Sequence, residues 1–89
     1  MSKLGKDMFI NKAENGDNNI CSKNIYNLRK QLGISQRELA DRLQIQSLDI
    51  DKNAIQRIEA GKRFVTDIEL LALSKVFNVN ISDLIDNTI

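Results

Sequence analysis

The sequence contains no histidine, tryptophan or proline, and Cys21 is its only cysteine. These residues cannot supply a disulfide framework, a Cys/His zinc site or a His-dependent catalytic triad within one chain. The longest apolar run, Leu70–Leu73, has four residues, far fewer than the roughly 20 that cross a bilayer. The N-terminal stretch has no apolar segment of signal-peptide length. We therefore expect no cofactor, no metal, no membrane contact and a reducing, cytoplasmic location.

The 89 residues allow one domain of about 70 residues and a tail. The first 20 residues are rich in Asn, Lys, Asp and Gly, and Met8, Phe9 and Ile10 form their only apolar cluster. Such a segment cannot bury enough surface to offset the entropy lost on ordering. The composition predicts a flexible N-terminal arm over 1–21 and a folded domain over 22–89.

Charge is unevenly distributed although the net charge is only +1. Residues 1–22 sum to zero, residues 23–63 carry nine basic and five acidic side chains, and residues 64–89 carry one basic and four acidic ones. The middle segment is therefore +4 and the last is −3. This asymmetry indicates one cationic face on a small domain, although solvated side chains placed by chance would give the same sums.

Apolar spacing and capping signals predict five short helices. Ile25, Leu28 and Leu32 recur at helical spacing, and Gly33 is suited to end that helix. Ser35 and Glu38 have the spacing of a capping box before the second helix.

The remaining helices have start signals of the same kind. Asp51 is an expected N-cap for a third helix that ends before Gly61, and Thr66 and Glu69 form a second possible capping box. A last short helix is expected near Ser82. No alternating strand pattern persists beyond four residues. The predicted fold class is all-α, a compact five-helix domain.

The third helix, Lys52–Ala60, has one polar face that lacks any acid. At about 100° per residue, Lys52, Asn53, Gln56, Arg57 and Ala60 fall within roughly 140° of each other. Ala54, Ile55 and Ile58 fall on the opposite side, with Glu59 at its edge. Lysine, arginine, asparagine and glutamine donors suit phosphates and the major-groove edges of guanine and adenine. The alternative is a solvated face with no role.

Neighbouring residues favour the nucleic-acid interpretation. Gln36 lies in the first turn of the second helix, where backbone N–H groups attract phosphate. Lys62 and Arg63 follow the third helix and could reach a second phosphate. Arg37 and Arg42 are interpreted instead as partners of the nearby acids on the second helix.

Arg29 and Glu59 are predicted to form a structural pair. Glu59 lies at the edge of the inward arc of the third helix, so a bond from Arg29 would fix the first helix relative to the third. A buried pair adds little net stability, but removing one partner is costly.

The segments IYNLRKQLGISQRELADRL, NAIQRIEAGKR and TDIELLALSKVFNVNISDLI resemble the helix-turn-helix domain of phage repressors, Cro proteins and their bacterial relatives, the XRE family. The resemblance covers residues 23–86 and implies a repressor-like DNA-binding domain. Helices 2 and 3 would form the helix-turn-helix, with helix 3 in the major groove of double-stranded DNA. No enzymatic activity is expected, because without histidine Cys21 lacks its usual activating base and the sequence contains no Gly-rich phosphate loop.

The resemblance implies a role for each matching residue. Base-reading positions correspond to Lys52, Asn53 and Arg57, and Gln56 would read bases or face the groove wall. Backbone contacts correspond to Gln36, Lys62 and Arg63, and the structural pair to Arg29 and Glu59.

The sequence departs from the family between helices 2 and 3. The usual turn has about four residues, whereas Gln44–Ile50 spans seven. The longer turn could tilt helix 3 or let Leu48 pack as an additional core residue. Ala60 also stands where the family often has Asn.

The expected function is that of a sequence-specific transcriptional regulator, with repression favoured, acting as a homodimer on a two-fold site. The dimer surface would come from the arm or from the C-terminal helix, where Ile89 is the better candidate, Ile85 is equally suited to core closure, and Leu84 favours the core. The alternative is an antitoxin-like module that binds a partner protein through Met8, Phe9 and Ile10 and regulates its own synthesis through DNA.

Overall fold

The computed structural model describes residues 12–13 and 15–86. Five helices lie in this part of the chain: α2 Ser22–Leu32, α3 Gln36–Ile45, α4 Lys52–Glu59, α5 Asp67–Phe77 and α6 Ile81–Ile85. No strand occurs among the described residues, and the prediction of an all-α, five-helix domain is confirmed. None of these helices is long and apolar enough to cross a membrane.

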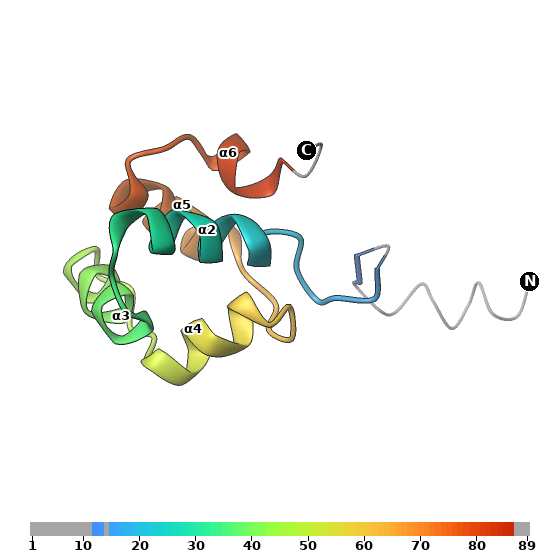
Figure 1. Ribbon diagram of the computed structural model, residues 1–89, viewed down its shortest axis with the longest axis horizontal. Coiled ribbons are helices and arrows are strands. Elements are labelled where there is room, and N and C mark those ends of the chain that lie inside the picture. The colour runs from blue at the N-terminus through green and yellow to red at the C-terminus, as the bar shows by residue number, and fades with distance from the viewer. Residues whose placement is uncertain (1–11, 14, 87–89) are drawn as a thin grey trace, which may run out of the picture.

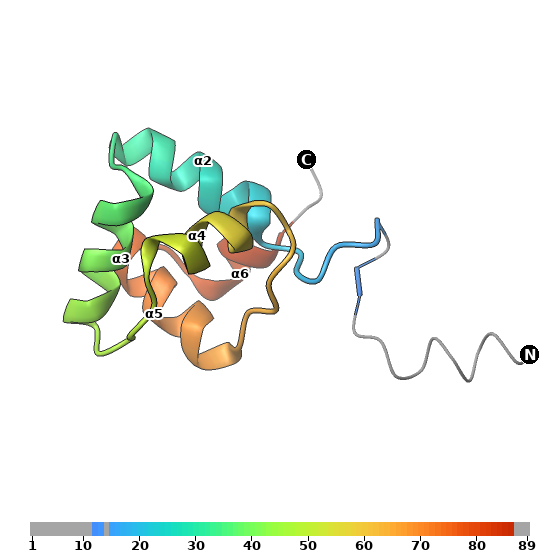
Figure 2. The ribbon, with the colours of Figure 1, turned by 90° about the horizontal axis from the view of Figure 1, so that it is seen from below.

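The helices surround one core, with α4 on the outside. In Figure 1, α2 crosses the middle of the domain, α6 lies above it, α3 stands at one end and α4 forms the lower edge. Figure 2 views the molecule from below, and α4 is then the helix nearest the viewer. One long side of α4 therefore faces away from the other helices.

Every helix contributes apolar side chains to the core. The fully buried ones are Ile25, Leu39, Leu43, Ile55, Ile58, Leu73 and Leu84. Their spacing on each helix forms one inward stripe, as the sequence pattern predicts. Removal of this apolar surface from water is the main stabilising contribution to the fold.

Side chains cap the helix starts that the sequence predicted. Asp51 Oδ1 accepts from the Ala54 N–H at 2.8 Å, and Thr66 and Glu69 form a complete, reciprocal capping box. At α3, Ser35 Oγ accepts from the Glu38 N–H at 3.0 Å, but the Glu38 carboxylate bonds Arg42 instead. That capping box is only half formed. The last helix begins at Ile81, one residue earlier than expected.

Four helices are followed, within two residues of their last residue, by a residue in the left-handed conformation. These residues are Gly33, Ser47, Gly61 and Asn78, with φ angles of 70°, 64°, 76° and 56°. After α3, the N–H groups of Ser47 and Leu48 bond the carbonyls of Gln44 and Leu43 at 2.9 and 3.0 Å. This paired pattern is a Schellman motif, which satisfies carbonyls that the helix leaves without partners.

The long turn between α3 and α4 is anchored in the core. Helix α3 extends to Ile45, so residues 46–51 form the connection. Leu48 packs against the core from a half-buried position, and Ile50 is 7% exposed. The extra residues therefore add two apolar contacts, and the interpretation of Leu48 as an additional core residue holds.

Part of the predicted N-terminal arm is packed on the domain. Among the described residues of segment 1–21, Cys21 is 2% exposed and belongs to the core. The Asn18 N–H donates to the Gly61 carbonyl at 2.8 Å. Residues 18–21 are thus structurally continuous with the domain expected to begin at residue 22. The apolar cluster Met8–Ile10 lies outside the described residues.

The Cys21 thiol is buried, and its pKa is raised to about 11. Burial is the largest cause of this shift, a backbone hydrogen bond opposes it, and the Glu69 carboxylate adds to it. Because the thiolate is the reactive form, we predict that a soluble disulfide reagent labels Cys21 only as fast as the protein opens. Labelling at pH 8 should become fast in denaturant. A Cys21→Ser, Lys23→Cys variant, whose thiol is exposed, is the control, and equally fast labelling of both folded proteins would contradict the prediction.

Candidate nucleic-acid interface

The outward face of α4 presents four exposed polar side chains. Lys52, Asn53, Gln56 and Arg57 are all exposed, whereas Ile55 and Ile58 on the inward face are fully buried. Within the described part of the chain, the four polar side chains make no hydrogen bond or ion pair. Figure 2 shows α4 from the side that no other described helix covers. Their donors and charges are therefore available to a ligand.

Arg29 and Glu59 fix α4 against α2. Arg29 Nε donates to Glu59 Oε2 at 2.6 Å and Nη2 donates to Oε1 at 2.9 Å, with side chains 9% and 6% exposed. The third nitrogen, Nη1, donates to the Ile34 carbonyl at 2.9 Å. Hydrogen bonding to Glu59 raises the pKa of Arg29 above its usual value. All three guanidinium nitrogens are used, and the pair expected from the helical wheel is present.

Gln36 joins the same network from α3. Its Nε2 donates to Glu59 Oε1 at 3.0 Å, so one carboxylate connects α2, α3 and α4. Gln36 is half-buried, and its amide oxygen and second amide N–H make no hydrogen bond within the described residues. Gln36, which was expected to contact a phosphate, is therefore held in place by Glu59 of α4.

Arg63 is bound within the protein. Its Nη1 and Nη2 donate to the two Glu69 oxygens at 2.9 and 3.0 Å, and Nη1 also donates to the Phe64 carbonyl at 3.1 Å. Only 28% of the Arg63 side chain is exposed. Lys62, by contrast, is exposed and makes no ion pair within the described residues. Of the two cations after α4, only Lys62 carries an uncompensated charge.

The two arginines on α3 differ from each other in their partners. Arg42 donates to Glu38 at 3.1 Å in an exposed pair, as expected. Arg37 is exposed and forms no hydrogen bond or ion pair, within the described residues, with the acids that were expected to pair with it, Glu38 and Asp41. Asp51, the acid next to the polar face of α4, is occupied as a helix cap.

Sequence reasoning missed a contact between the N-terminal segment and the end of α4. Asn18 and Asn19 donate to backbone carbonyls between Ile58 and Arg63, which lie 39 to 44 residues away. Nothing local in an Asn-rich stretch indicates such distant partners. The pair Arg63–Glu69 was missed because Glu69 already had a role as a capping residue.

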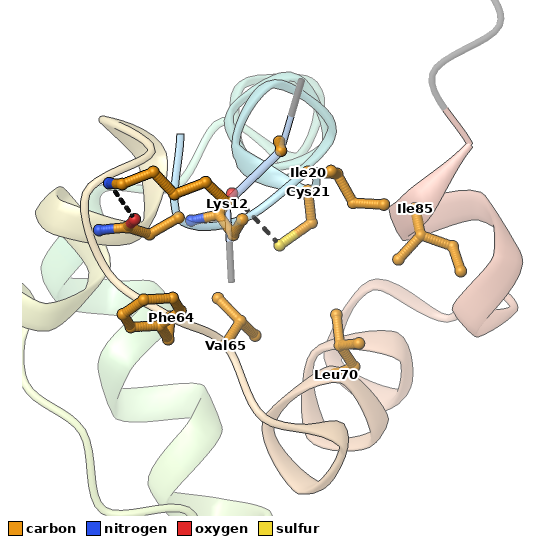
Figure 3. Close-up of a pocket in the computed structure, with 10 residues that line it drawn as sticks. Lys12, Ile20, Cys21, Phe64, Val65, Leu70 and Ile85 are labelled. Atoms are coloured by element: carbon orange, nitrogen blue, oxygen red, sulfur yellow. Dashed lines mark hydrogen bonds between the residues drawn. The ribbon is translucent and has the colours of Figure 1, made fainter. Parts of the chain in front are cut away.

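A hollow beside this segment is lined by apolar side chains, including Ile20, Phe64, Val65, Leu70 and Ile85 (Figure 3). It contains none of the four exposed side chains of α4. No group of three or more His, Cys, Asp or Glu residues able to hold a metal occurs in the part of the chain that the structure describes.

The capped helix α3, the turn after it and the exposed, donor-rich helix α4 have the arrangement of a helix-turn-helix. A family model described as helix-turn-helix matches residues 25–84. The chain belongs to this family, the XRE-type helix-turn-helix proteins, and is a DNA-binding regulator. No curated protein and no solved structure matches it. The family consists of DNA-binding regulators, typically without enzymatic activity.

The buried network leads to a stability prediction. Arg29→Ala leaves the Glu59 carboxylate without its charged partner, so we expect a loss of about 3–5 kcal/mol in the free energy of unfolding. Arg42→Ala is the control, because it breaks an exposed pair worth about 1 kcal/mol or less. Urea unfolding measures both. Equal, small losses would show that the buried pair does not hold α2 and α4 together.

A second prediction concerns acid. Burial raises the pKa of Glu69, but hydrogen bonds from Arg63 and Thr66 outweigh burial, so the pKa is lower than its usual 4.5. The stability that ionised Glu69 gives the folded state is therefore fully present above pH 4.5, and it is lost as the pH falls through the lower pKa of the folded state.

Glu69→Gln should cost roughly 1–3 kcal/mol at pH 7 and should reduce the decline in stability below pH 4.5. Asp67→Asn, at an exposed position of the same helical turn, is the matched control. Thermal unfolding between pH 3 and pH 7 compares them. An acid profile of Glu69→Gln that parallels the wild-type profile would contradict this assignment.

Proposed function

We propose that this protein is a sequence-specific transcriptional repressor that binds double-stranded DNA as a homodimer, with α4 in the major groove. The observation that carries the proposal is the exposed face of α4, where Lys52, Asn53, Gln56 and Arg57 have free donors. Family membership supports binding to DNA, and the free donors support direct reading of bases.

The four α4 side chains suit different base edges. An arginine such as Arg57 can bond O6 and N7 of guanine together, and Asn53 or Gln56 can bond N6 and N7 of adenine. Lys52, at the first position of α4, can reach guanine or a phosphate. These contacts would supply the sequence preference.

Gln36 and Lys62 would hold the domain on the DNA backbone. Gln36 is the first residue of α3, where the backbone N–H groups and the positive end of the helix dipole attract phosphate. Lys62 carries the free charge beyond the end of α4. Arg63, whose guanidinium is bound to Glu69, is assigned to the loop structure and not to a phosphate contact.

A dimer is proposed because one recognition helix buries little surface, and pairing two half-sites raises affinity and selectivity. Exposed apolar side chains on α5 and α6 could supply the contact: Ile68, Leu71, Ile81 and Ile85 are 70%, 46%, 38% and 38% exposed. Leu84 is fully buried and serves the core, and Ile89 lies outside the described residues.

We further propose that the protein acts in the cytoplasm.

The alternative function, neutralisation of a partner toxin, depends on Met8, Phe9 and Ile10, which lie outside the described residues. The contacts of the described residues therefore do not support this alternative.

The two kinds of DNA contact should be separable by substitution. Arg57→Ala should cost roughly 1–3 kcal/mol on a duplex selected for binding, and much less on random duplex. Lys62→Ala should weaken both duplexes about equally and reduce the slope of log affinity against log salt by about one. Fluorescence anisotropy at several salt concentrations measures both effects.

Lys75→Ala removes an exposed cation from α5, outside the proposed interface, and should change neither affinity nor slope. Equal losses for Arg57→Ala on the selected and random duplexes would argue against base reading by α4. Failure of the wild-type protein to bind any duplex would end the proposal.

A further inference from the structure

We infer that Asn18 and Asn19 clamp the loop after α4 and thereby position Lys62 for contact with the DNA backbone. The inference rests on the proposed function and adds positioning residues to it. These two residues precede the stretch that the helix-turn-helix family model matches, residues 25–84. Figure 3 shows the segment beside the loop that contains Phe64 and Val65.

Four bonds form the clamp. The Asn18 N–H donates to the Gly61 carbonyl, and Asn18 Nδ2 donates to the Lys62 carbonyl, both at 2.8 Å. Asn19 Nδ2 donates to the Ile58 carbonyl at 3.1 Å and to the Arg63 carbonyl at 2.8 Å. The last carbonyls of a helix lack partners within the helix. The clamp provides a second donor to the Ile58 carbonyl, which also accepts from the Gly61 N–H, and it provides donors to the three carbonyls of residues 61–63.

The two asparagine amides are held at both ends. Lys12 Nζ donates to Asn18 Oδ1 at 2.9 Å, and the Cys21 thiol, in the core, donates to Asn19 Oδ1 at 3.8 Å (Figure 3). Each amide oxygen therefore faces a donor, while each amide nitrogen faces the loop carbonyls. These partners define which way each amide points.

Close packing at Gly61 shows how tightly the segment lies on the loop. A Cβ atom at this position would lie 2.5 Å from the Asp17 carboxylate carbon, so any side chain at residue 61 would require the Asp17 carboxylate to move. The left-handed φ of 76° also favours glycine at this residue. The segment and the loop are therefore in contact through backbone as well as side chains.

Lys62 lies at the centre of these contacts. Its own carbonyl and those of Gly61 and Arg63 accept from the clamp, and the Arg63 side chain is tied to Glu69. The backbone of Lys62 is thus held on both sides, whereas its side chain is exposed. A phosphate contact from a fixed backbone requires less ordering on binding than one from a free loop.

Asn19→Ala tests the clamp in a double-mutant cycle with Lys62→Ala. On the selected duplex we expect Asn19→Ala to lower affinity by roughly 2- to 10-fold, to lower the salt slope toward that of Lys62→Ala, and to cause no further loss in the Lys62→Ala background. Asn18→Ala is the second variant, for use if Asn19→Ala unfolds. All measurements are made well below each melting temperature.

Asn24→Ala is the matched control. Asn24 Nδ2 donates to the Leu84 and Asp86 carbonyls at 2.8 and 2.9 Å, at the end of α6. Its loss removes two bonds of the same kind away from Lys62, so stability should fall while the salt slope stays unchanged. An unchanged slope for Asn19→Ala, with losses that add to those of Lys62→Ala, would overturn the clamp.

A failure of the proposed function can be recognised separately. If the wild-type protein binds no duplex, the proposed DNA binding is wrong. If Lys62→Ala leaves the salt slope unchanged, the proposed contact between Lys62 and the DNA backbone is wrong. Amide hydrogen exchange then tests the clamp alone. Asn19→Ala should accelerate exchange at residues 61–64 more than Asn24→Ala does, and equal exchange in the two variants would overturn the clamp.

Discussion

The arrangement of the domain depends on one carboxylate, that of Glu59. Arg29 and Gln36 both donate to it, so α2, α3 and α4 meet at a single pair of oxygens. The same contact compensates the one acid within α4. Because the carboxylate is almost fully enclosed, it fixes the rotation of α4 about its own axis, and this rotation directs the polar face with Lys52, Asn53 and Arg57 outward.

Cations of this domain fall into two groups that differ in their partners. Arg29 and Arg63 donate to buried or half-buried carboxylates and hold helices and a loop in place. Lys52, Arg57 and Lys62 form no ion pair within the described residues and lie on α4 or just after it. Exposed cations without an ion pair in the described residues also occur on α2 and α3, among them Lys23 and Arg37, so the uncompensated charge of the middle segment includes the proposed DNA-facing side without being confined to it. This separation allows one small domain to be both stable and electrostatically attractive to phosphate.

Much of the fold was predictable because its signals are local. Apolar spacing gave the buried face of each helix, and Asp51, Thr66 and Gly61 marked helix ends correctly because caps act within a few residues. The Glu38 half of the first capping box was wrong because Arg42, one turn later, competes for the same carboxylate. Sequence reasoning also found the pair of Arg29 and Glu59, since the helical wheel placed the acid on the inward edge.

The features that sequence reasoning missed depend on distant contacts. Asn18 and Asn19 find their acceptors about 40 residues later in the chain, and an asparagine-rich stretch looks the same whether or not such acceptors exist. The bond from Arg63 to Glu69 was not expected either, because the position of Arg63 after α4 is the same with or without this bond. The left-handed conformation of Ser47 was not expected either, since glycine and asparagine are the usual residues there.

The central claim is that the outward face of α4 enters the major groove. Methylation interference on a duplex selected from a random pool tests it most directly, because guanine N7 lies in the major groove and adenine N3 lies in the minor groove. We predict that methylation at guanine N7 prevents binding at two clusters of positions, about one helical turn apart and related by two-fold symmetry. Interference confined to adenine N3, or absent at both positions, would contradict the account.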